Sequence, residues 1–272
     1  MTYDPRRAAD YWSGPRHERG DELAAVLSLG EPPSVNRAYD DWETGLLLES
    51  LGDLASARVL DLGAGVGRVS ARLAPRAGRL VCGDFAPGML QRLRSRLRAA
   101  GVPDRRYDPV RHRADALPYR DRSFDVIVCL GLLEHLPPPA RSRTLREAAR
   151  TLRTGGRLAL VLNNARSRFL GDPGDNPHRV GVQRENGYFC AVVDEEAILA
   201  EAKNWFDAEC LGSNALYSMQ RHAARLLSDA TRAADTTGAF VERAAVWDRA
   251  LRTRDGLARA AADHHLYLLR RR

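Results

Sequence analysis

Lysine is almost missing from this sequence of 272 residues: Lys203 is the only one, so arginine carries the formal net charge of +7. The arginines are scattered and aromatic residues are not interleaved among them, a pattern typical of solvated surface rather than of a nucleic-acid-binding track. A positive field of this kind can still steer an anionic molecule toward a site. Charge alone therefore leaves the type of partner open.

Cysteines are few, and Cys82, Cys129, Cys190 and Cys210 stand far apart. This spacing fits neither a zinc site nor a disulfide framework, so buried, reduced thiols are the expectation. The sequence also lacks any run of about 20 apolar residues, the length that spans a membrane. Because the polar start at 1–7 has no apolar leader core, we expect a cytoplasmic protein with no membrane partner.

What the chain does contain is a regular alternation of short apolar runs and helix-length segments. This alternation predicts β-α units around a mostly parallel sheet. The apolar runs are continuous rather than alternating, which is typical of strands covered by helices on both sides. Strands are expected at 58–62, 79–83, 124–130 and 157–162, with a weaker one at 110–113 and two more at 208–211 and 265–269.

The segments on either side of this array read differently. Residues 1–50 hold helical stretches broken by Gly and Pro, which we expect to form a lid over a core at 51–163. The remainder, 164–272, is expected to face the substrate, and helical spacing at about 214–262 predicts an insertion before the last strand. With 44% hydrophobic and 28% charged residues, the whole chain has the composition of one globular domain.

The most informative stretch is a strand, a glycine turn and a helix start at 59–70. Three glycines, the first at Gly63 and the last at Gly67, allow positive φ and let a ligand approach the backbone without a Cβ clash. The dinucleotide-binding fingerprint needs glycine at the sixth place, where Arg68 stands instead. Asp61 lies two residues ahead of the first glycine. This form resembles the first motif of class I S-adenosylmethionine-dependent methyltransferases.

Three further pieces follow in the order and spacing of that family. Asp84 closes the second strand, where a carboxylate can accept hydrogen bonds from both ribose hydroxyls, although it also suits a helix cap. Asp115 and Ala116 resemble the segment that brackets the adenine, with the carboxylate facing the exocyclic amine. The segment 152–158 is similar to the turn before the fifth strand. The resemblance extends from about 39 to 162.

The resemblance implies a Rossmann-like α/β fold: a seven-stranded, mostly parallel sheet with an antiparallel last strand, an N-terminal helical lid and a helical insertion before the last strand. It implies a small-molecule (UbiE/UbiG-like) methyltransferase with S-adenosylmethionine as cofactor and S-adenosylhomocysteine as product. The residues expected to hold the cofactor are Tyr39, Asp61, Gly63, Ala64, Gly65, Asp84, Phe85, Met89, Asp115, Ala116 and Leu130.

A general base is needed only where the methyl acceptor must lose a proton. His135, after the fourth strand, is the candidate because imidazole titrates near neutrality; the structural alternative is that Glu134 and His135 merely order the loop. Some quinone O-methyltransferases of this family bind a divalent cation here through two glutamates and the histidine. Gly131 stands at the first glutamate position. We therefore expect no metal.

Other side chains are weaker candidates, each with a structural alternative in a turn, a solvated loop or the core. On the substrate side they are Asn163, Asn164 and His178, and for an aromatic lid they are Tyr11, Trp12, Tyr39 and Trp42.

The favoured hypothesis is methyl transfer to an oxygen or nitrogen of a small metabolite such as a natural product. A nucleic-acid (RNA) methyltransferase is the first alternative, but 130–133 reads Leu-Gly-Leu-Leu where base-methylating relatives carry a run that grips a flipped base. Nucleic acid is therefore not the expected partner. A catalytically silent cofactor-binding subunit is the second alternative. The acceptor and the oligomeric state stay open, a homodimer being one option.

Overall fold

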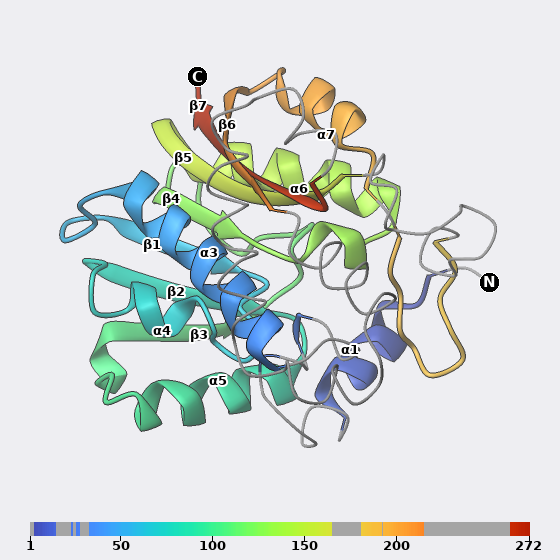
Figure 1. Ribbon diagram of the computed structural model, residues 1–272, viewed down its shortest axis with the longest axis horizontal. Coiled ribbons are helices and arrows are strands. Elements are labelled where there is room, and N and C mark those ends of the chain that lie inside the picture. The colour runs from blue at the N-terminus through green and yellow to red at the C-terminus, as the bar shows by residue number, and fades with distance from the viewer. Residues whose placement is uncertain are drawn as a thin grey trace, which may run out of the picture.

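The computed structural model describes residues 3–14, 23, 26–27, 33–164, 181–191, 193–214 and 262–272. Its sheet has seven strands in the order β3-β2-β1-β4-β5-β7-β6 (Figure 1). The first five run parallel, and β7 pairs antiparallel with both β5 and β6. The predicted Rossmann-like α/β sheet with its antiparallel last strand is confirmed. The strands are β1 (Arg58–Leu62), β2 (Arg79–Asp84), β3 (Tyr107–Arg111), β4 (Phe124–Cys129), β5 (Leu152–Asn163), β6 (Phe206–Asn214) and β7 (His264–Arg271).

Three strands begin two or more residues before the predicted start. The third strand was expected at 110–113 but begins at Tyr107, because β3 lies at the sheet edge and its middle residues are only half-buried. Pro109 fits there, since an edge strand can lack one backbone donor. The fifth strand begins at Leu152 instead of residue 157, and the sixth at Phe206 instead of residue 208.

Helices cover both faces of the sheet, as the continuous apolar strands predicted. In β1, Val59 packs with the helices of one face and Leu60 with those of the other, so successive residues feed two separate cores. Figure 1 shows α3 crossing one of these faces. The first core includes α3 (Pro33–Leu51), α4 (Ser70–Leu73) and α5 (Pro87–Ala99), and the second includes α6 (Pro138–Thr151) and α7 (Glu195–Ala202).

The N-terminal segment contributes α1 (Pro5–Ser13), which begins at an Asp4 cap with proline in the first turn. It lies against α5: Ser13 Oγ accepts a hydrogen bond from Gly88 N at 3.2 Å, and Arg92 donates to Gly14 O at 3.3 Å. The predicted insertion at about 214–262 and the loop with His178 fall almost wholly outside the described residues, and the predicted division at 50 and 163 stays a prediction. Within the described ranges, none of the helices is both long and apolar enough to cross a bilayer.

A buried ion network fixes α3 to the glycine turn after β1. Arg68 lies 2.7 Å from Asp40 Oδ1 and 2.5 Å from Glu43 Oε2, and the three side chains are 8%, 7% and 2% exposed. Burial lowers the pKa of Arg68, but the two carboxylates outweigh it and raise that pKa above its ordinary value. Tyr39 Oη also donates to Glu43 at 3.3 Å. Arg68, which stands where the dinucleotide-binding fingerprint needs glycine, thus anchors α3.

Replacing Arg68 with methionine should destabilise the protein by about 3–5 kcal/mol, because Glu43 is left buried without its cation and Asp40 keeps only the half-exposed Arg72. The matched control is Arg79→Met, which removes an exposed pair with Asp108 and should change stability by about 0–1 kcal/mol. Urea unfolding of both variants measures the difference. Equal losses of free energy in the two variants would contradict a structural role for the buried network.

Candidate active site

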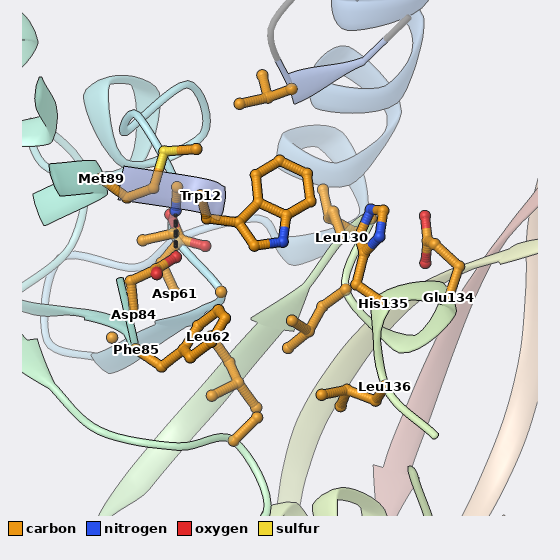
Figure 2. A pocket seen from close by; sticks show the side chains of 18 of the residues that line it. Trp12, Asp61, Leu62, Asp84, Phe85, Met89, Leu130, Glu134, His135 and Leu136 are labelled. Carbon is orange, nitrogen blue, oxygen red and sulfur yellow. Dashed lines mark hydrogen bonds between the residues drawn. The ribbon is translucent and has the colours of Figure 1, made fainter. Parts of the chain in front are cut away.

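One cavity lies at the carboxyl ends of β1, β2 and β4, where parallel sheets place their ligands (Figure 2). Ala116 is exposed and does not line it; Ala114, two residues earlier, does. All the other residues predicted from the sequence for cofactor or catalysis line it: Tyr39, Asp61, Gly63, Ala64, Gly65, Asp84, Phe85, Met89, Asp115, Leu130 and His135.

The three glycines of the turn have different roles, although all have positive φ, at 78°, 54° and 80° in chain order. A Cβ on Gly67 would lie 2.9 Å from the side chains of Leu93 and Leu97, so this glycine allows α5 to pack closely. A Cβ on Gly63 would lie 3.0 Å from Leu132. A Cβ on Gly65 would lie 3.8 Å from the nearest atom, in the side chain of Val26. Gly65 therefore presents the open, bare backbone that a ligand can approach.

Asp84 joins the ends of β1 and β2 across this turn. Its Oδ2 accepts a hydrogen bond from Gly65 N at 2.9 Å and its Oδ1 accepts one from Ala86 N at 2.9 Å. The position of Asp84 is therefore compatible with both roles predicted from the sequence, a carboxylate that faces a ligand and a local cap. Burial raises the pKa of Asp84 to about 6. Each oxygen keeps a second lone pair with which to accept a further hydrogen bond.

Asp61 lies beneath the same turn and is also buried. Ser70 Oγ donates to its Oδ2 at 2.5 Å, which ties β1 to the start of α4. Burial raises the pKa of Asp61 to about 6. Two carboxylates with raised pKa values therefore flank the glycine turn.

Asp115 is held by two arginines that the sequence reasoning missed. Arg113 Nε lies 2.8 Å from Oδ1 and Arg143 NH2 lies 2.7 Å from Oδ2, while the Asp115 side chain is 5% exposed. Burial opposes ionisation, but the hydrogen bonds from both arginines lower the pKa of Asp115 below its ordinary value. Arg143 comes from α6, so no local pattern could pair it with Asp115. The predicted contact of this carboxylate with an adenine amine stays a prediction.

His135 belongs to the one-turn helix η3 (Leu133–His135), and its ring orientation is fixed. Its Nδ1 lies 2.9 Å from the carbonyl oxygen of Phe189. Because a carbonyl can only accept, Nδ1 carries the proton and Nε2 keeps its lone pair in the neutral ring. Trp12 packs edge-on against the imidazole, with ring centroids 4.8 Å apart. The ring is thus held as an Nε2 acceptor.

A buried arginine, also missed from the sequence, holds the η3 turn in place. Arg141 Nε donates to the Leu133 carbonyl at 2.8 Å and its NH2 donates to the Ala191 carbonyl at 3.0 Å. Ala191 N in turn donates to the Glu134 carbonyl at 2.8 Å. Burial lowers the pKa of Arg141. The position of His135 therefore depends on a segment more than fifty residues further along the chain.

That segment, 181–191, is tied to α1. Gln183 exchanges two hydrogen bonds with the backbone of Asp4, at 2.7 and 2.9 Å. Gly187 has φ +92°, and a Cβ on it would lie 2.2 Å from the Arg7 carbonyl oxygen. Figure 2 shows the indole of Trp12, which α1 carries, between Met89 and His135. Trp12 therefore lines the cavity, while the aromatic lid itself stays a prediction; no local signal pointed to Gln183 or Gly187.

The remaining candidates have structural roles in the described part of the chain. Tyr39 lines the cavity, but its hydroxyl donates to Glu43. Trp42 is buried in the core, and Tyr11 is one of the buried residues of α1. Asn164 donates to the Ala262 carbonyl at 2.9 Å, which joins the ends of β5 and β7.

The sequence profile of the family described as "Methyltransferase domain" matches residues 59–156. The chain is 40% identical over 137 residues to the methyltransferase GfsG of Streptomyces halstedii, covering 48% of this chain and 47% of the relative. It is 42% identical over 154 residues to the 27-O-demethylrifamycin SV methyltransferase of Amycolatopsis mediterranei, covering 52% and 55%. The chain thus spans about half the length of these curated relatives.

Among solved structures, the chain is similar to the YcgJ protein of Bacillus subtilis, with a TM-score of 0.56 at 20% sequence identity, over 85% of this chain and 98% of that one. At this identity the likeness establishes the shared fold. The matched motifs lie on the strand ends that build the cavity. The match over residues 59–156 and the methyltransferase relatives therefore support a methyltransferase domain that uses S-adenosylmethionine as cofactor.

Proposed function

We propose that this chain transfers a methyl group from S-adenosylmethionine to an oxygen or nitrogen of a small metabolite, with a natural product as the favoured acceptor. The observation that carries the proposal is one cavity lined both by the glycine turn with Asp84 and by the oriented imidazole of His135. The names of the relatives support it, because one is a methyltransferase for a rifamycin hydroxyl.

The residues of the donor side fit an adenosyl group. Gly65 offers bare backbone, and the free lone pairs of Asp84 can accept hydrogen bonds from two ribose hydroxyls. Phe85 and Met89 offer apolar faces for the adenine, with Trp12 packed against the same cluster. Tyr39, Asp61, Gly63, Ala64, Asp115 and Leu130 complete this proposed site.

When bound, S-adenosylmethionine supplies a methyl group that its own sulfonium charge has already activated. The protein's contribution is then positioning and the exclusion of water, which together can lower the barrier by several kcal/mol. Gly65 and Asp84 would hold the adenosyl group so that an acceptor oxygen could take the methyl group, with the electron pair of the broken carbon–sulfur bond left on sulfur. His135 Nε2 accepts the proton of an acceptor hydroxyl, while Nδ1–H stays bonded to the Phe189 carbonyl.

Asp84→Ala should weaken the binding of S-adenosylhomocysteine about tenfold to a hundredfold, since hydrogen bonds from two hydroxyls to one carboxylate are lost. Isothermal titration calorimetry measures this. Asp207→Ala is the control, because Asp207 is an exposed residue of β6 paired with Arg272. Unchanged affinity in Asp84→Ala would remove Asp84 from the cofactor site.

The affinity for S-adenosylhomocysteine should also fall as the pH is lowered through about 6, where the free protein protonates Asp84 and Asp61. Ribose hydroxyls donate to the ionised carboxylate, so binding is strongest above this pH and weakens below it. Calorimetry from pH 7.5 to pH 5 tests the sign. In Asp84→Asn the dependence should be shallower. An affinity that stays level or rises toward pH 5 is the contrary result.

His135→Asn should slow methyl transfer about 10²–10⁴-fold, because an asparagine amide can still donate to the Phe189 carbonyl but lacks the basic Nε2. The assay supplies methyl-labelled S-adenosylmethionine with panels of hydroxylated metabolites, of amines and of RNA. The affinity for S-adenosylhomocysteine should be unchanged. Label found in RNA alone, or in no acceptor, would instead support one of the two alternatives, an RNA methyltransferase or a silent subunit.

A further inference from the structure

Glu134 differs from every other carboxylate that lines the cavity. Its side chain is half-buried beside His135 (Figure 2), and it has no hydrogen bond or ion pair in the described part of the chain. The other four are all bonded. Glu43 and Asp115 pair with arginines, Asp61 accepts from Ser70, and Asp84 accepts from Gly65 and Ala86. A partly desolvated carboxylate that accepts no hydrogen bond is unfavourable unless a ligand supplies a donor.

The surroundings of Glu134 leave its carboxylate open on the cavity side. Gly131 has φ +65°, and a Cβ on it would be 3.8 Å from Glu134 Oε1, so no side chain stands over that oxygen from Gly131. The walls of the cavity nearby are apolar, with Leu132, Leu136 and Val161. No group of His, Cys, Asp and Glu among the described residues is arranged to hold a metal ion.

The buried Arg141 interacts electrostatically with Glu134, but its guanidinium donates to backbone carbonyls and makes no ion pair with that carboxylate among the described residues. The two arginines among the described lining residues, Arg68 and Arg113, are each committed to other carboxylates. The local charge of the described lining is therefore negative, the opposite of the net charge of the whole chain. An anionic group next to Glu134 would be repelled, whereas a hydrogen-bond donor would be favoured.

We propose that Glu134 selects the methyl acceptor by accepting a hydrogen bond from a hydroxyl or protonated amine adjacent to the hydroxyl that His135 deprotonates. This inference rests on the proposed function. An ionised carboxylate can only accept hydrogen bonds, and Nε2 of the neutral His135 ring also accepts. Two neighbouring acceptors in one cavity match a molecule with two neighbouring donors. The acceptor class is thus a vicinal diol or an amino alcohol carried on an apolar body, rather than a carboxylate or phosphate.

The test measures the binding of small fragments to the protein saturated with S-adenosylhomocysteine, by ligand-observed NMR titration. The fragments with two adjacent donor groups are catechol, cis-1,2-cyclohexanediol and trans-2-aminocyclohexanol. Phenol and cyclohexanol are the matched fragments with a single hydroxyl, and salicylate is the anionic fragment. We expect the paired donors to bind about tenfold more tightly than the single hydroxyls, the gain from one hydrogen bond to a charged group. Salicylate should bind most weakly.

Glu134→Gln should erase this preference and improve the binding of salicylate, because the charge is removed while the shape is kept. Glu49→Gln, on the exposed side of α3, is the control and should behave like the wild type. The proposal is overturned if no diol or amino alcohol binds, or if Glu134→Gln retains the wild-type ranking. Failure of S-adenosylhomocysteine itself to bind in calorimetry would instead overturn the proposed function.

Discussion

The hydrogen bond from Gly65 N to the Asp84 carboxylate joins the ends of two neighbouring strands, and the cavity is built around it. The turn that supplies Gly65 also supplies two other constraints. Gly67 lets α5 approach to van der Waals contact, and Arg68 fixes α3 through a buried ion network. The residues of the glycine turn after β1, together with Arg68, therefore determine the shape of the turn and the positions of α3 and α5.

The two sides of the cavity are built in different ways. The proposed donor side comes from short local segments at strand ends, so its geometry follows directly from the β-α order of the sheet. The acceptor side is assembled over long sequence separations. The Phe189 carbonyl accepts a hydrogen bond from the His135 ring, Arg141 holds the turn that carries His135, and Trp12 packs against the ring. Such an arrangement allows acceptor specificity to vary while the donor site stays the same.

The parts that the sequence predicted are those with local signals. Buried strands such as β1 and β4 appear as continuous apolar runs, and the positive-φ positions of the turn appear as glycine spacing. The misplaced start of β3 reflects a half-buried edge strand that contains Pro109. The pairing of Asp115 with Arg143 and that of Gln183 with Asp4 depend on the folded path of the chain. No periodicity in the sequence reports contacts of that kind.

We propose that the glycine turn at 63–67 and Asp84 hold an adenosyl group with its sulfur facing His135. A crystal structure of the full chain with S-adenosylhomocysteine tests it most directly. We expect the adenosine to lie against the backbone of Gly65, both ribose hydroxyls to donate to Asp84, and the sulfur to face His135 Nε2. A product molecule bound elsewhere, or one whose sulfur faces away from His135, would contradict it.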